Sequence, residues 1–237
     1  MTLIKKTVTS FILLGVMPLA SLSLAACSGK TSTSVETSPS NPSTAQMDHG
    51  SMSSPSSSSP MPTDHNSMMN MDLGPADESF DLRFIDGMTP HHEGAVVMAQ
   101  EALQKSNRPE IKQLAQAIIN AQEQEISQLK QWRTAWYPNA GDQAVMYSAA
   151  MGHTMPMTEE MRSSMMMEGN LGAADDQFDL RFINAMIPHH QGAVNMAQQA
   201  LEKSNRPEIK ELAQNIITSQ QQEIDQMMQW KKDWYGQ

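Results

Sequence analysis

The chain has 237 residues and a formal net charge of −10, so it should attract cations and repel nucleic acid. Its single cysteine, Cys27, excludes a disulfide framework. Methionine is unusually abundant, with 22 residues, while aromatic residues make up only 5% of the chain.

Residues 1–26 have the features of a signal peptide. Lys5 and Lys6 precede an apolar run from Phe11 to Leu24, which is too short to cross a bilayer of about 30 Å. The stretch Leu-Ala-Ala-Cys resembles the bacterial lipoprotein cleavage motif, which implies that Cys27 becomes lipidated; cleavage without lipidation is the alternative. We therefore expect a membrane-anchored lipoprotein in the periplasm or cell envelope, on either the inner or the outer membrane.

Residues 27–75 should form a flexible tether, because Ser, Thr and Pro dominate and large apolar side chains are almost absent. The tether has little or no core for methionine to fill, yet it carries Met47, His49, Met52, Met61, His65, Met68, Met69 and Met71. These clusters are candidate metal ligands.

An internal repeat predicts the fold. Shifting the chain by 98 residues aligns Phe80–Tyr137 with Phe178–Tyr235 without a gap, and 40 of the 58 positions are identical. Each copy has two amphipathic stripes separated by Ser-Asn-Arg-Pro-Glu, which indicates a helical hairpin with its turn near 105–108. Two such hairpins, 76–137 and 176–237, predict an all-α, antiparallel, ferritin-like four-helix bundle.

Two local features leave alternatives open. Pro90 either kinks one long helix or begins a new helix capped by Thr89. Asn107, followed by Pro109 and Glu110, predicts the cap of the second helix.

The segment 138–175 should be a long, partly helical connector. It is rich in methionine, and its candidate ligands are Met151, His153, Met155, Met157, Met161, Met165, Met166 and Met167. Met157, Met161 and Met165 would share one helix face, which suits either packing or metal capture.

Each hairpin also carries a candidate metal site. Thioethers are soft donors that favour Cu(I) or Ag(I), and imidazole binds copper in both common oxidation states. One sulfur can share a cation with an imidazole three or four positions later on a helix. The candidates are Met88, His91 and His92 in the first copy and Met186, His189 and His190 in the second. Four other bundle methionines, Met98, Met196, Met227 and Met228, are assigned mainly to packing.

In each hairpin, one carboxylate occupies an apolar-stripe position of the second helix. It is Glu125 in the first hairpin and Glu223 in the second. They could orient a ligating imidazole. Alternatively, they could pair with Arg83 and Arg181 on the partner helix.

The stretch Met-Ile-Pro-His-His at 186–190, with Gly-Ala after it and the Glu-Ile and Trp positions of the second helix, resembles the bacterial family called domain of unknown function 305. The layout is similar to that of periplasmic copper-binding members of the family. This resemblance implies copper binding and copper tolerance, through Met88, His91, His92, Met186, His189 and His190. Thr89 stands where the motif usually has an apolar residue.

Together these features predict a non-enzymatic protein that buffers, sequesters or transfers Cu(I), with Ag(I) as a surrogate. A copper efflux or chaperone protein is a candidate partner. The alternative is a Met-rich bundle that docks an envelope partner without metal. A metal-dependent oxidase is disfavoured, because the Glu-x-x-His pairs of such bundles are absent.

Overall fold

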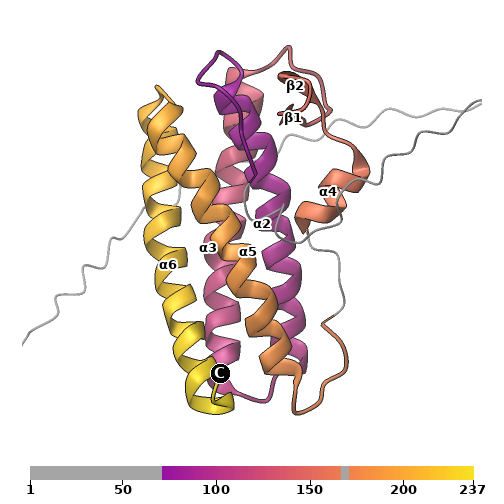
Figure 1. Cartoon of the computed structure of the whole chain (residues 1–237), viewed down its shortest axis with the longest axis vertical. Coiled ribbons are helices and arrows are strands. Elements are labelled where there is room, and N and C mark those ends of the chain that lie inside the picture. Colours follow the sequence, from indigo (N-terminus) through magenta and orange to yellow (C-terminus); the bar gives the residue numbers. More distant parts are fainter. Residues whose placement is uncertain (1–70, 167–170) are drawn as a thin grey trace, which may run out of the picture. The chain divides into compact units, whose positions relative to one another are not determined.

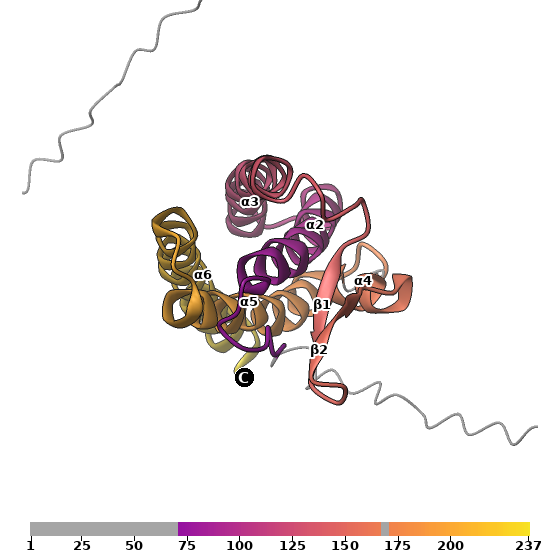
Figure 2. The ribbon, with the colours of Figure 1, turned by 90° about the horizontal axis from the view of Figure 1, so that it is seen from above.

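The computed structural model describes residues 71–166 and 171–237, and these residues fold around two helical hairpins. The first hairpin is α2 (Phe80–Lys105) and α3 (Pro109–Trp136), and the second is α5 (Phe178–Lys203) and α6 (Pro207–Tyr235). Helices α2 and α5 contact each other, while α3 and α6 pack on their own hairpin partners. The predicted four-helix bundle is therefore confirmed (Figures 1 and 2).

The turn of each hairpin lies where the sequence predicts it, but its cap is different. Helix α3 begins at Pro109, which suits the first turn because proline lacks an N–H that would be left unpaired. Asn107 is not the cap; Arg108 precedes the helix, and its N–H donates to Ser106 Oγ at 3.0 Å. The repeat reproduces this bond between Arg206 and Ser204 at 3.1 Å.

Proline lies inside a continuous helix in both repeats. Helix α2 runs through Pro90 and α5 runs through Pro188, so the alternative of a new helix beginning at Pro90 is wrong. Thr89 does not cap a helix; its hydroxyl donates to the carbonyl of Ile85 at 2.8 Å. The buried faces on both sides of Pro90 hold the helix together across the missing backbone bond.

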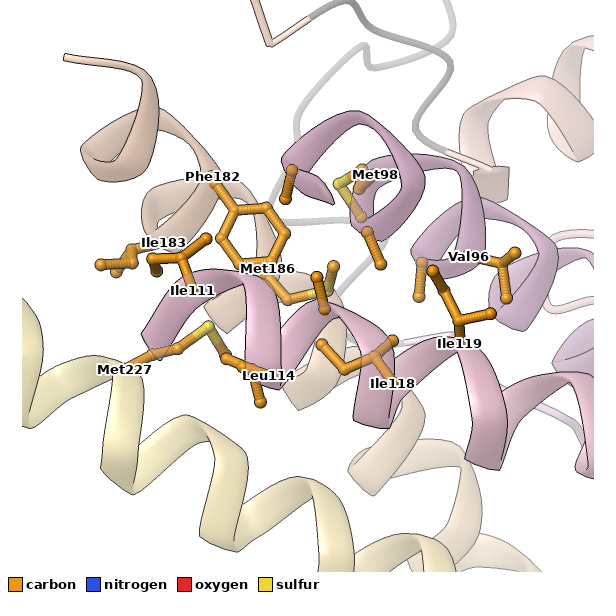
Figure 3. Close-up of a cluster of buried hydrophobic side chains, with 14 of the residues drawn as sticks. Val96, Met98, Ile111, Leu114, Ile118, Ile119, Phe182, Ile183, Met186 and Met227 are labelled. Atoms are coloured by element: carbon orange, nitrogen blue, oxygen red, sulfur yellow. The ribbon is translucent and has the colours of Figure 1, made fainter. Parts of the chain in front are cut away.

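The core divides into two hydrophobic clusters, one towards each end of the bundle. Figure 3 shows the first, in which side chains from all four helices meet: Met98 from α2, Ile111 and Leu114 from α3, Phe182 and Met186 from α5, and Met227 from α6. The second cluster contains the same positions of the opposite repeat, including Phe84, Met88, Met196, Ile209 and Leu212. The histidines of both repeats lie outside these two clusters.

The connector contains a β-hairpin that the sequence analysis did not foresee. Strands β1 (Val145–Ser148) and β2 (His153–Pro156) are antiparallel, and α4 (Glu159–Met166) follows them. They lie on the side of α2 and α5 away from α6 (Figure 2). The expectation of a partly helical connector matches α4, whereas the strands depend on contacts with α2 that short polar segments do not reveal.

Both hairpins begin with a short strap held by an arginine. Arg83 donates to the carbonyls of Leu73 and Pro75, and its partners also include Thr154 in β2 and Asp77. Arg181 makes the equivalent bonds to Leu171 and Ala173. These arginines therefore fix the chain that enters each hairpin.

Candidate metal centre

The two repeats meet at a pair of histidine rings. His91 of α2 and His189 of α5 have ring centroids 3.8 Å apart and planes inclined by 41°. They occupy the same position in the two repeats, so the approximate twofold relation between the hairpins passes through this contact. The sequence predicts one candidate site in each repeat, and the structure brings the two sets together in one centre.

Burial sets the protonation of this pair. Desolvation lowers the pKa of His91 and of His189 well below the ordinary value, and the neighbouring histidines lower it further. The backbone carbonyl of Met165 acts weakly in the opposite direction on His189. Both imidazoles are therefore neutral at pH 7, which is the form that coordinates a metal.

The adjacent histidines face the outer helices and meet the two stripe carboxyl groups. His92 Nε2 lies 2.8 Å from Glu125 Oε2, and His190 Nε2 lies 2.7 Å from Glu223 Oε2. The alternative pairing of these glutamates with Arg83 and Arg181 is wrong, since both arginines bind the straps. For His190, assigning the ring proton to Nε2, where the carboxyl group of Glu223 accepts it, leaves Nδ1 with a free lone pair.

Several ring nitrogens at this centre are buried without a hydrogen bond. Within the described residues these are Nδ1 of His91 and His190 and both ring nitrogens of His92 and His189. An unpaired buried polar atom is costly and is expected to have a missing partner, such as a metal ion or a water molecule. The centre thus presents lone pairs from both helices.

Both carboxyl groups are partly exposed, with side-chain exposed fractions of 16% for Glu125 and 17% for Glu223. Glu223 lines a groove of about 610 Å³ between α3 and α6, together with Glu110 and Trp230. His190 itself is fully buried behind Glu223. A cation drawn to this acidic groove would meet the carboxyl group before the imidazole.

The helix methionines lie close to the centre along the chain but pack into the core. Met88 and Met186 are fully buried, one turn before the histidines, and belong to the two hydrophobic clusters. Met98, Met196 and Met227 are buried as predicted. Met228 is 53% exposed, so its assignment to packing is wrong.

The connector brings the end of α4, with Met165 and Met166, to the centre. Helix α4 packs on α2 so closely at Gly94 that a Cβ there would overlap the carbonyl of Met166. Gly94 lies just after His92, so this contact places the end of α4 beside the histidines. Met157 and Met165 are buried, and Met161 and Met166 are half-buried.

The β-hairpin carries a separate, exposed set of candidate ligands. Met151 and His153 are exposed, and His153 lies opposite Ser148. Met155 lies opposite Met146, which places both thioethers on the same face of the hairpin. The sequence analysis did not single out Met146; its place in the methionine-rich connector was the available signal.

The remaining candidates lie outside the described residues. They are Cys27, Met47, His49, Met52, Met61, His65, Met68, Met69 and Met167. In the part of the chain that is described, no three or more His, Cys, Asp and Glu side chains form a group that could hold a metal ion. No helix in this part is long and apolar enough to cross a membrane.

The fold and this centre define a helical bundle built from two hairpins that share buried histidines and methionines. A family model described as "Domain of unknown function (DUF305)" matches residues 29–133 and 81–231. The chain therefore belongs to the DUF305 family.

Solved structures of a protein named CopM resemble the bundle. The Cu(I)-bound form is 39% identical with a TM-score of 0.51, and the Cu(II)-bound form is 43% identical with a TM-score of 0.52. A silver-bound form has 39% identity and a TM-score of 0.52. Each comparison covers 65% of this chain and 97% of the CopM chain.

A curated relative, the uncharacterized protein L153 of Acanthamoeba polyphaga mimivirus, is 45% identical over 49 residues. That match covers 21% of this chain and spans about a third of the relative's length (32%).

Proposed function

We propose that this protein binds Cu(I), and Ag(I) as its surrogate, at the histidine centre between α2 and α5. The observation that carries the proposal is the set of buried, unpartnered imidazole nitrogens contributed by both repeats. Neutral imidazole is a good copper ligand. Thioethers are soft ligands, so methionines near the histidines favour Cu(I) over Cu(II).

Two further observations support this proposal. The carboxyl group of Glu223 is hydrogen-bonded to Nε2 of His190, and that of Glu125 lies 2.8 Å from Nε2 of His92, an arrangement that commonly orients ligating histidines. The similar CopM structures were solved with Cu(I), Cu(II) and silver bound.

In the cell, we infer that the protein buffers, sequesters or transfers copper in the envelope and contributes to copper tolerance. The methionine and histidine clusters of the tether and connector would supply additional, weaker and exchangeable sites. The lipid anchor at Cys27 and delivery to a copper efflux or chaperone protein belong to the same proposal. It assigns no catalytic reaction to the chain.

The test is an anaerobic Cu(I) titration against a competing chelator. Replacing His91 and His189 together by Gln should weaken the tightest site by about 10- to 100-fold or more, because ligands contribute at least as much as the groups that orient them. The matched control is His153→Gln, on the exposed β-hairpin, which should leave that site unchanged. Unaltered affinity in the double variant would refute the assignment of the centre, and no binding tighter than micromolar would refute copper binding.

A further inference from the structure

The space beside Gly87 in α2 is bounded by two thioether sulfurs. At the position that a Cβ would occupy there, the nearest atoms are Met71 Sδ at 3.5 Å and Leu73 Cδ2 and Met196 Sδ, each at 3.7 Å. The two sulfurs are therefore at most about 7 Å apart. They come from the strap that precedes α2 and from α5, so sequence spacing could not have paired them.

Hydrogen bonds to α5 fix the strap in this place. The side-chain amide of Gln199 donates to the carbonyl of Met71 at 2.7 Å and accepts from the N–H of Leu73 at 3.0 Å. Lys203 Nζ donates to the carbonyl of Gly74 at 2.8 Å. Met71 is thus held over α2 by its own backbone, and its position does not depend on hydrophobic contact alone.

The second repeat fastens its strap in a similar way, because the N–H of Leu171 donates to Glu101 and Lys105 Nζ donates to the carbonyl of Gly172. It lacks the glycine and the first methionine of the thioether pair. Ala185 replaces Gly87, Gly169 replaces Met71, and Glu101 in α2 takes the place of Gln199. Glycine destabilises the interior of a helix relative to alanine, and alanine is accommodated at this position in the other repeat. The nearest atoms at Gly87 are 3.5 Å away or more, an ordinary van der Waals distance, so packing does not require glycine there.

We propose that Met71 and Met196 bind a soft monovalent cation, Cu(I) or Ag(I), in the space left by Gly87. Thioethers are neutral, soft donors that select such ions. Metal–sulfur bonds are about 2.3 Å long, so each sulfur needs to move by little more than 1 Å, and methionine is flexible enough to do so.

This site deepens the proposed function and rests on it. Met71 is half-buried and ends the methionine-rich tether, whereas Met196 is buried. Gly87 lies one helical turn before His91. The thioether pair therefore stands between the tether and the histidine centre, where it can receive copper from the first and pass it to the second.

The discriminating variant is Gly87→Ala, because its methyl group fills the space between the sulfurs without a steric clash. The full chain carrying Cys27→Ser is labelled at its methionine methyl groups and titrated with Ag(I). In the parent protein, the methyl resonances of Met71 and Met196, assigned by single Met→Leu changes, should shift together during the titration. In Gly87→Ala both shifts should disappear, with the bound silver reduced by one equivalent and the urea midpoint equal or higher.

Met98→Leu is the matched control, since Met98 occupies the position of Met196 in the other repeat, where Ala185 stands in place of Gly87. This variant should keep the silver-induced shifts of Met71 and Met196 and should bind as many equivalents of silver as the parent protein, apart from any bound by Met98 itself. The site would be refuted if both shifts remained in Gly87→Ala, or if the Met196 resonance did not shift in the parent protein. Either result is compatible with continued silver binding at the histidines. Loss of all silver binding in the parent would instead contradict the proposed function.

Discussion

At the scale of single residues, the histidine pair is the least ordinary feature of the core. Two imidazoles with centroids 3.8 Å apart cannot both be protonated inside a bundle without strong repulsion. Burial lowers the pKa of both His91 and His189, and neighbouring histidines lower it further: His189 acts on His91, and His190 and His92 act on His189. The fold keeps these two side chains neutral.

This neutrality predicts a pH-dependent stability. The unfolded chain binds protons on its histidines near pH 6.5, whereas folded His91 and His189 resist protonation. The contribution of these two histidines to the free energy of unfolding should be constant above about pH 7. It should become less favourable to the folded state as the pH falls below about 6.5. The slope is at most about 1.4 kcal/mol per pH unit for each histidine.

Urea unfolding of the metal-free protein between pH 7.5 and 5.5 measures this slope. The variant with Gln at both positions serves as the control and should show a weaker dependence. Equal stability of the parent protein at both ends of the range would contradict the prediction.

At the scale of elements, one buried ion pair fastens the connector to the first hairpin. Arg133 near the end of α3 donates to Asp86 of α2 at 2.6 Å, and the N–H of Val145 in β1 donates to the same carboxyl group at 2.8 Å. Arg133 also donates to the carbonyls of Gly141 and Gln143. Burial raises the pKa of Asp86 against the opposing effect of Arg133. The second repeat has Asn184 and Lys231 at these positions.

Arg133→Ala should therefore destabilise the protein by about 2–4 kcal/mol, because it leaves the Asp86 carboxylate buried without its cation. It should also increase hydrogen exchange in β1 and β2. The matched control is Lys231→Ala, at the same position of the second repeat, which is expected to change stability by less than about 0.5 kcal/mol. Unfolding and hydrogen-exchange measurements check both, and equal effects of the two changes would contradict the role given to Asp86.

At the scale of the whole molecule, two reciprocal clamps join the hairpins. Arg206, in the turn of the second hairpin, lies 4.2 Å from the centroid of Trp136 in α3, a ring stacked on Trp132. Arg108, in the turn of the first hairpin, lies 4.1 Å from the centroid of Trp234 in α6. Each arginine also pairs with an aspartate of the other hairpin, at 3.4 Å. The clamps lie at the two opposite ends of the bundle.

Removing one clamp, with Arg206→Ala, should lower the free energy of unfolding by about 1 kcal/mol, because the Arg206 side chain is 40% exposed in both its cation–π contact and its ion pair. The double change Arg108→Ala and Arg206→Ala should be nearly additive, because the two sites are far apart. Arg206→Lys keeps the charge and should recover only part of the loss, since an ammonium lacks the planar stacking surface. Full recovery by Lys would show that the charge alone matters.

The sequence by itself determined the bundle, because a duplicated pattern of apolar residues at steps of three and four can bury its stripes only by pairing two hairpins. It also selected the Pro-His-His residues and the two stripe glutamates as exceptional. It left open whether Glu125 pairs with an imidazole or with Arg83, and the structure decides for His92 because Arg83 binds the strap.

Only the tertiary structure decided which residues meet. The contact of His91 with His189 joins positions 98 residues apart, and the approach of Met71 and Met196 to Gly87 brings a strap and a distant helix to one place. The β-hairpin likewise forms because Asp86 and Arg83 on α2 receive it, and its own short strands carry little pattern. Periodicity records which face of a helix is buried, whereas the crossing of two helices decides which residues share a site.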